Sequence, residues 1–220
     1  MNTQENFILD AIEPEVADLV VAGRRSFFAK YAGTAAVLGS APLVLAMASQ
    51  EAFAAGGLPQ QVVDVLNFAL TLEYLEAAFY AEGNKAKGLI PVKYKALFRT
   101  IGGHETAHVK LLKGALGAAA VAAPKVDFTA GGKYADVFSN FTTFATLSAT
   151  FEDLGVAAYK GQAGNLAGSP VLTTALQIHS VEARHASAVR PLIGKPGWDG
   201  AFDKPKTKSE VLAAAKPFLA

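Results

Sequence analysis

Residues 104–108 read HETAH, and residues 181–185 read VEARH. Each stretch contains a glutamate followed three positions later by a histidine; the pairs are Glu105 with His108 and Glu182 with His185. In an α-helix, residues at positions i and i+3 lie on one face, so the two side chains of each pair point the same way. The two stretches therefore predict two helices that each present a carboxylate and an imidazole.

A further glutamate precedes each pair by about one helical hairpin. Glu73 lies 32 positions before Glu105, and Glu152 lies 30 positions before Glu182. These distances fit two antiparallel helices joined by a short connection. The chain is therefore predicted to contain two similar hairpins, each with one lone glutamate and one glutamate–histidine pair.

Four carboxylates and two imidazoles form a suitable ligand set for two iron or manganese ions, because carboxylates bridge and neutralise two cations while imidazoles complete the coordination. The alternative for either pair alone is charge on a solvated helix face. We expect Glu105 and Glu182 to bridge both ions, with the two histidines as terminal ligands. The predicted metal ligands are Glu73, Glu105, His108, Glu152, Glu182 and His185.

A tyrosine follows each lone glutamate by seven residues, as Tyr80 follows Glu73 and Tyr159 follows Glu152. Two helical turns place both side chains of such a pair on nearly the same face. Each phenol is expected to donate a hydrogen bond to a ligand of the opposite hairpin and so to support the chemistry of the site. The alternative is a core aromatic residue with a satisfied hydroxyl.

Other polar residues near these motifs are weaker candidates. Glu76 lies three residues after Glu73 and is an alternative ligand. His179 is expected outside the ligand set, either beside the ligands or at the surface, and His104 is expected to be structural because it points about 100° away from its neighbour Glu105. Arg184 is expected either to orient a ligand carboxylate or to face solvent.

The spacing of apolar residues by three and four predicts an all-α fold. The first helix is expected to end at Gly83-Asn84. Gly102-Gly103 is expected to interrupt the second helix by a bulge or to permit close backbone approach, and the alternative is a tolerated defect in the helix. Thr207 and Glu210 form a capping-box pattern that opens a short last helix. The expected helices run from Leu58 to Gly83-Asn84, from Pro91 to about Gly117, from Ser139 to Gln162, from Ser169-Pro170 to just before Pro191, and from Thr207 to Pro217, with a connecting loop over residues 124–136.

Composition limits the function classes. The 220 residues are 51% hydrophobic, contain no cysteine and carry a formal net charge of +1. The absence of cysteine excludes disulfides, zinc–thiolate sites, iron–sulfur clusters and thiol nucleophiles. A near-neutral chain without a basic stripe is not expected to bind nucleic acid.

Residues 1–54 differ from the remainder. Arg24 and Arg25 open the run RRSFFAK, an apolar stretch extends from Tyr31 to Ala48, and small residues follow at Ala52-Phe53-Ala54. This pattern resembles a twin-arginine export signal, which would make the export machinery a partner and the periplasm or exterior the destination. The segment is either cleaved, retained as a membrane anchor or packed as a core helix, and a membrane association is expected only if it is retained.

The strings ALTLEYLEAAFY, HETAH, FEDLGVAAY and VEARHA resemble the ferritin-like superfamily, and specifically its exported bacterial ferritin-like domain proteins of the desiccation-related type. The resemblance covers about Leu58 to Pro191. It implies an all-α, ferritin-like four-helix bundle with one long crossover, formed by residues 55–220, and it implies the six ligands given above. Relatives include iron-storing cages, rubrerythrins and manganese catalases, but the lack of cysteine argues against rubrerythrin-type electron delivery.

Two functions are consistent with these patterns. The first is a di-iron or di-manganese oxidoreductase that oxidises metal or consumes peroxide or dioxygen. The second is a non-catalytic metal-binding or stress-protective protein in which the ions only stabilise the bundle. Assembly into a homo-oligomer is left open. The sequence does not distinguish iron from manganese.

Overall fold

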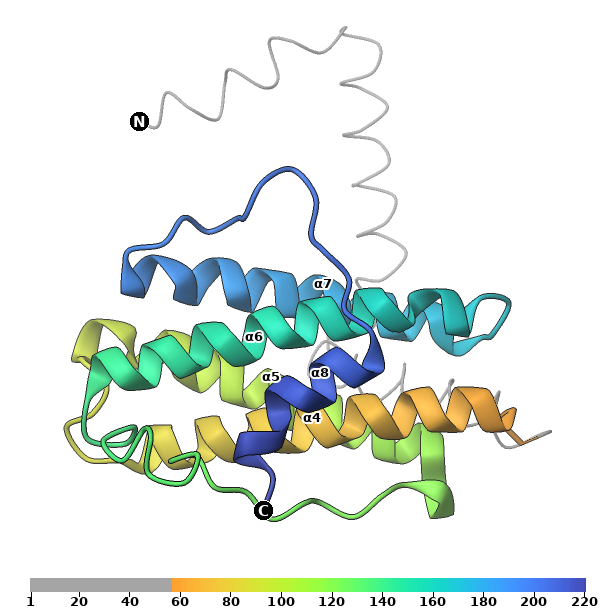
Figure 1. Ribbon diagram of the computed structural model, residues 1–220, viewed down its shortest axis with the longest axis horizontal. Helices are drawn as coiled ribbons and strands as arrows, with labels where there is room; N and C mark the ends of the chain where they lie inside the picture. Colours follow the sequence, from red (N-terminus) through yellow and green to blue (C-terminus); the bar gives the residue numbers. More distant parts are fainter. Residues whose placement is uncertain (1–56) are drawn as a thin grey trace, which may run out of the picture. The chain divides into compact units, whose positions relative to one another are not determined.

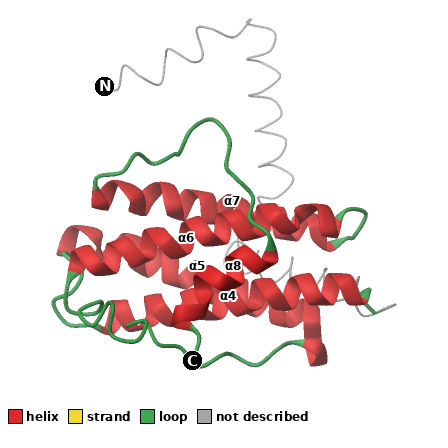
Figure 2. Ribbon diagram, in the orientation of Figure 1, coloured by secondary structure: helices red, strands yellow, loops and turns green. Residues whose placement is uncertain are grey.

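Four long α-helices and one short α-helix dominate the part of the chain that the structure describes. The computed structural model describes residues 57–220, so the predicted signal segment, residues 1–54, lies outside the described residues. The helices are α4 (Gln60–Lys85), α5 (Lys95–Leu116), α6 (Phe141–Gln162), α7 (Val171–Val189) and α8 (Lys208–Ala215). No strand forms in residues 57–220 (Figure 2), where the only β pairing is an isolated bridge between Val126 and Leu219. The predicted all-α bundle is confirmed.

The four long helices are arranged as two antiparallel hairpins. Figure 1 shows α4 paired with α5, and α6 paired with α7. The connection over residues 117–140 runs along the length of the bundle. As a result, α5 ends at one end of the bundle and α6 begins at the other. This long crossover lets α5 and α6 run in the same direction. Within residues 57–220, no helix is both long and apolar enough to cross a membrane.

The crossover is held in place by residues near position 220. The Asp127 N–H donates to the Phe218 carbonyl at 2.9 Å, and the Ala220 N–H donates to the Lys125 carbonyl at 2.9 Å. Phe218 also packs edge to face on Phe151 of α6, with 4.9 Å between ring centroids. The segment after α8 therefore ties the crossover to the bundle.

Polar caps fix several helix boundaries. The Asn140 side chain accepts hydrogen bonds from the N–H groups of Thr142 and Thr143, so the third bundle helix begins at Phe141 rather than at the predicted Ser139. The predicted capping box is confirmed, because the Thr207 hydroxyl accepts from the Glu210 N–H while the Glu210 carboxylate accepts from the Thr207 N–H. Such caps satisfy N–H groups that a helix start otherwise leaves unpaired.

The prediction that the first helix ends at Gly83-Asn84 is wrong, because α4 continues to Lys85. Gly83 is buried, and a Cβ atom there would lie 2.2 Å from Cε2 of Phe144. The glycine therefore serves close packing of α4 against α6. Tertiary packing of this kind outweighs the weak intrinsic helix propensity of glycine.

The Gly102-Gly103 pair does not interrupt its helix, which runs as one element from Lys95 to Leu116. A Cβ atom at Gly102 would lie 3.0 Å from Cβ of Tyr80, whereas Gly103 has no such neighbour within 4 Å. Close approach is therefore confirmed for Gly102, the bulge is wrong, and the open position of Gly103 fits the alternative of a tolerated glycine. The approach brings α5 against α4 beside Tyr80.

Two apolar clusters enclose the centre of the bundle. One cluster is aromatic and surrounds Phe79, whose ring stacks on Phe144 at 4.9 Å and meets Phe151 edge to face at 5.0 Å. The other cluster is mostly aliphatic and includes Leu70 and Leu112. The middle turns of all four long helices lie between these clusters, shielded from solvent.

We predict that Gly83→Ala destabilises the protein by about 1–3 kcal/mol, because the new methyl group would overlap the buried Phe144 ring. Gly103→Ala is the matched control. It adds the same methyl group to an exposed helical position without neighbours and is expected to stabilise by about 0.5–1 kcal/mol. Urea unfolding followed by circular dichroism measures both changes, and equal effects of the two substitutions would contradict this packing role.

Candidate metal centre

Each long helix contributes one glutamate to the centre of the bundle. Glu73 comes from α4, Glu105 from α5, Glu152 from α6 and Glu182 from α7, and all four side chains are 0% exposed. His108 and His185 lie one turn after the α5 and α7 glutamates and are 8% and 5% exposed. The structure thus brings all six sequence-predicted ligands together.

The six residues form two overlapping groups. Glu73, Glu105, His108 and Glu182 offer oxygen and nitrogen atoms that all lie within 4.8 Å of one another. The same holds for the second group, which consists of Glu105, Glu152, Glu182 and His185. Glu105 and Glu182 belong to both groups. This overlap is consistent with a carboxylate-bridged dinuclear metal site.

The histidine Nδ1 atoms face the carboxylates. His108 Nδ1 lies 3.1 Å from oxygens of Glu105 and Glu182 and 3.2 Å from Glu73 Oε2. His185 Nδ1 lies 2.9 Å from Glu105 Oε1 and 3.2 Å from Glu152 Oε2. Each Nδ1 atom therefore lies close to carboxylate oxygens from two or three helices.

Several of these buried oxygens lack a hydrogen bond, namely Glu105 Oε1 and both carboxylate oxygens of Glu182. His185 Nδ1 approaches Glu105 Oε1 closely, but the direction of the contact does not make it a hydrogen bond. Leaving buried carboxylate oxygens unpaired is costly, so such atoms call for an explanation. Two cations between the shared glutamates would satisfy them, which shows that the residues fit a dinuclear group.

Burial and mutual repulsion govern protonation of most of the carboxyl groups. Burial, followed by the nearby Glu182 carboxylate, raises the pKa of Glu73 well above its ordinary value. Burial and the charges of Glu182 and Glu105 raise the pKa of Glu152 despite its contact with His185. In the metal-free protein both shifts favour the protonated, uncharged form of the carboxyl group.

The pKa values of the two histidines and of Glu105 shift in the directions that favour the charged forms. Burial disfavours the imidazolium, but contacts with Glu105, Glu182 and Glu73 outweigh it and raise the pKa of His108 to about 12. Contacts with Glu105 and Glu152 likewise overcome burial and raise the pKa of His185 to about 10. Burial also opposes ionisation of Glu105, yet the two histidines lower its pKa to about 2.

The two predicted tyrosine contacts are confirmed. The Tyr159 hydroxyl of α6 donates to Glu73 Oε1 of α4 at 2.5 Å, and the Tyr80 hydroxyl of α4 donates to Glu152 Oε1 of α6. Each phenol thus holds one oxygen of the lone glutamate from the other hairpin. Burial and the charge of the contacted glutamate raise the pKa of both phenols, so they remain protonated donors.

The structure places the weaker candidate residues in different surroundings. Glu76 is buried, at 3% exposure, and faces Gly155 of α6 beside Glu182. Arg184 is exposed and donates to Ser180, so it faces solvent rather than a ligand carboxylate. His179 is half-buried and belongs to neither of the two ligand groups.

His104 is a residue of the site that sequence reasoning missed. Its Nδ1 lies 2.9 Å from Nε2 of His185, and the two rings stack with 5.2 Å between centroids. Because Nδ1 of His185 faces the glutamates, this contact fixes the outer nitrogen and the orientation of the ring. His104 precedes His108 by four residues, so the two histidines are predicted to share one face of α5. The contact of His104 with His185 on α7 cannot be predicted from the sequence.

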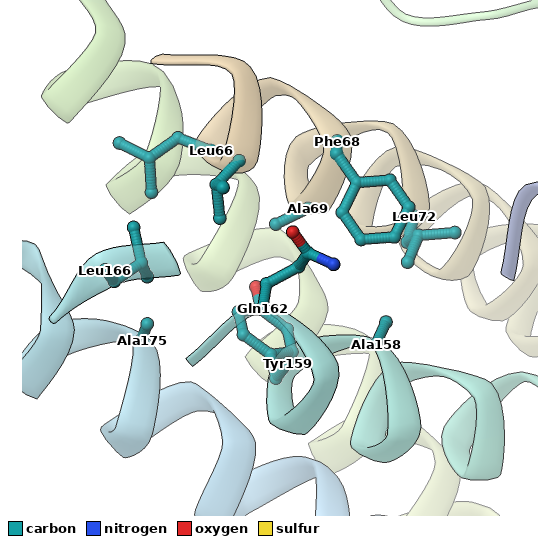
Figure 3. A pocket seen from close by; sticks show the side chains of 10 residues that line it. Leu66, Phe68, Ala69, Leu72, Ala158, Tyr159, Gln162, Leu166 and Ala175 are labelled. Atoms are coloured by element: carbon teal, nitrogen blue, oxygen red, sulfur yellow. The ribbon is translucent and has the colours of Figure 1, made fainter. Parts of the chain in front are cut away.

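A small apolar pocket adjoins the Tyr159 side of the centre. Figure 3 shows it between α4 and α6, with the Gln162 amide pointing inward from α6. Its wall includes Tyr159 but no carboxylate, imidazole or basic side chain, so the pocket adds no ligand to the centre. The lining residues include Leu66, Phe68, Ala69, Leu72, Ala158, Leu166 and Ala175.

Comparison with known proteins agrees with this geometry. The sequence profile of the ferritin-like domain family matches residues 61–195. That range covers nearly all of the four long helices and contains all six residues of the two ligand groups. A search of curated proteins finds no match.

We predict that the metal-free protein loses stability as the pH rises from about 6.5 to 10. The raised pKa values of His108 and His185 mean that their stabilisation is complete below about 6.5 and is lost as the pH approaches their folded-state values. The raised pKa values of Glu73 and Glu152 act in the same direction, because the folded state binds more protons than the unfolded state. The free energy of unfolding should fall by roughly 2 kcal/mol or more.

Urea unfolding of chelator-treated protein at several pH values measures this loss. Metal-loaded protein is the control, because cations take the place of the protons and should remove the decline. A metal-free protein whose stability stays constant or rises over this interval would contradict the proposed protonation of the cluster.

Proposed function

The chain belongs to the ferritin-like domain family, and from this premise we propose that its buried glutamates and histidines bind two iron or manganese ions at a redox-active centre. The observation that carries the proposal is the pair of overlapping ligand groups that share Glu105 and Glu182. Both shared residues have oxygens without a hydrogen bond, as bridging ligands would in the absence of their cations.

The residues divide naturally between two positions. Glu73 and His108 belong to one group alone, and Glu152 and His185 belong to the other alone, so each pair would hold one ion. Four carboxylates carry four negative charges and thereby neutralise two divalent ions. The attraction between the carboxylates and the ions would be strong in this buried site, because solvent screens charges poorly there.

Two bound ions would supply electron transfer between divalent and trivalent states, for oxidation of metal or consumption of peroxide or dioxygen. The surrounding residues would restrict water and orient the ligands. Tyr80 and Tyr159 each hold one oxygen of a lone glutamate and leave the other oxygen facing a histidine. Both phenols are buried near the cluster and are the candidate groups for supporting chemistry there.

The enclosure of the cluster favours a second candidate, a non-catalytic protein that the ions stabilise. All four glutamates are fully buried, and only the histidine edges reach the surface. A stress-protective role of the desiccation-related type belongs to this alternative. Metal-loaded protein that consumes neither peroxide nor dioxygen, and does not accelerate iron oxidation, would favour stabilisation over redox catalysis.

We predict that Glu105→Ala and His185→Ala each lose about one metal equivalent or more, because each substitution removes a buried ligand. Changes to ligands and their partners typically weaken metal binding by 10-fold or more. Metal-free proteins are loaded anaerobically with Fe(II), or with Mn(II), and the bound metal is measured after removal of excess. Glu82→Ala, at an exposed position of α4, is the control and should retain both equivalents.

Absence of specific metal binding by the unaltered protein would overturn the proposed function. Full binding by both ligand variants would instead reject the ligand assignment. Peroxide consumption, dioxygen consumption and iron oxidation are then measured on the same loaded samples, so that binding and redox chemistry are judged separately.

We further propose that the protein is exported by the twin-arginine route. The support is the RRSFFAK run at residues 24–30 with its following apolar stretch. A route for folded cargo suits a metal site that is filled where the cell controls metal supply, because affinity alone follows a fixed order among metals.

Replacement of Arg24 and Arg25 together by lysine should leave full-length, metal-loaded protein in the cytoplasm. The change preserves charge and therefore tests the arginine pair itself. Cell fractionation with immunodetection measures the distribution, and lysine at Arg99, an exposed position of α5, is the control substitution. Unchanged appearance of the double variant outside the inner membrane would contradict this export route.

A further inference from the structure

The two hairpins carry the same site residues at matching positions, but one buried position beside these residues holds a carboxyl group in only one hairpin. The third residue after the lone glutamate is Glu76 in α4 and Gly155 in α6. The matching pairs are Glu73 with Glu152, Tyr80 with Tyr159, Glu105 with Glu182, and His108 with His185. One hairpin therefore has an extra carboxyl group where the other has no side chain.

The missing side chain makes room for the extra carboxyl group. A Cβ atom at Gly155 would lie 3.3 Å from Oε1 of Glu76 and 3.1 Å from Oε2 of Glu182. The two carboxyl groups therefore converge on the same glycine from α4 and α7. Glu76 is 3% exposed, so its carboxyl group is held inside the bundle.

The strongest charges that act on Glu76 are negative. Burial and then the charges of Glu182, Glu152, Glu105 and Glu73 raise its pKa well above the ordinary value. Apolar residues of α4 and α6 line the rest of its environment, among them Leu72, Leu75, Phe151 and Leu154. Oε2 of Glu182, which lies beside Gly155, has no hydrogen bond although Glu182 is fully buried. A cation near Gly155 would be a suitable partner for both carboxylates.

We propose that Glu76 is a fifth carboxylate of the metal centre, admitted by Gly155 and acting beside Glu182, so that the two metal positions differ chemically. This inference rests on the proposed dinuclear function. Four carboxylates balance two divalent ions, and the fifth adds the negative charge that balances one ion after its oxidation to the trivalent state. The added carboxylate thus favours tight binding and oxidation at one position.

The Glu76→Gln variant tests the inference without loss of shape. The amide matches the carboxyl group in size and cannot become an anion, so the metal-free fold should be retained. Titration of metal-free protein with Mn(II) should give two binding events in the unaltered protein. In Glu76→Gln, one event should weaken by about 10-fold or more. Glu82→Gln, at an exposed position of the same helix, is the matched control and should bind like the unaltered protein.

A second variant pair moves the carboxylate to the other hairpin. Glu76→Gly should lose affinity at one position, and Glu76→Gly combined with Gly155→Glu should regain it, because α6 would then supply the carboxylate to the vacated space. Electron paramagnetic resonance of the Mn(II)-loaded proteins reports whether the coordination of one ion changes. Circular dichroism of the metal-free proteins confirms that each variant is folded, and Glu76→Gln alone decides the matter if the double variant does not fold.

The outcomes separate this inference from the function on which it rests. Two tight Mn(II) equivalents in the unaltered protein, with unchanged affinities and spectra in Glu76→Gln, would overturn the role of Glu76 and leave the dinuclear site standing. Absence of Mn(II) and Fe(II) binding by the unaltered protein would overturn both. Weakened binding in Glu76→Gln but not in Glu82→Gln would establish the fifth carboxylate.

Discussion

Mutual repulsion among buried carboxylates is the constraint around which this bundle is arranged. Each of four helices places a glutamate at the same level of the core, and the only opposite charges available within the two ligand groups are those of two imidazoles. Protons and hydrogen bonds from two phenols relieve part of the repulsion in the metal-free protein. The apolar clusters on either side then supply the stabilisation that lets the helices hold this arrangement.

The convergence of these glutamates and histidines was predictable because its geometry is local. A spacing of three residues on a helix, with a hairpin between the lone glutamate and each pair, determines which side chains converge. The tyrosine contacts followed from the same regularity, since seven residues is close to two turns. Periodicity therefore predicts that Glu73, Glu105 and Tyr80 lie together at the centre of the bundle, where the structure places them.

Contacts between helices were harder to predict from the sequence. Gly83 has the appearance of a helix terminator, yet it accommodates the ring of Phe144, which lies 61 positions away in the chain. His104 points away from its neighbour Glu105 but reaches His185 on another helix. Such relations depend on which residue of a second helix stands opposite, and a single sequence does not specify that pairing.

The hydrogen bonds that join residues 218–220 to the crossover have a consequence for the timing of folding. A ribosome adds Phe218 and Ala220 after it has synthesised both hairpins, so the crossover between α5 and α6 stays untied while the first hairpin already exists. Hairpins can form as they emerge, because their contacts are close in sequence. Closure of the bundle is thus a late event of biosynthesis, which leaves an interval in which the carboxylates are still open to ions from the surrounding solution.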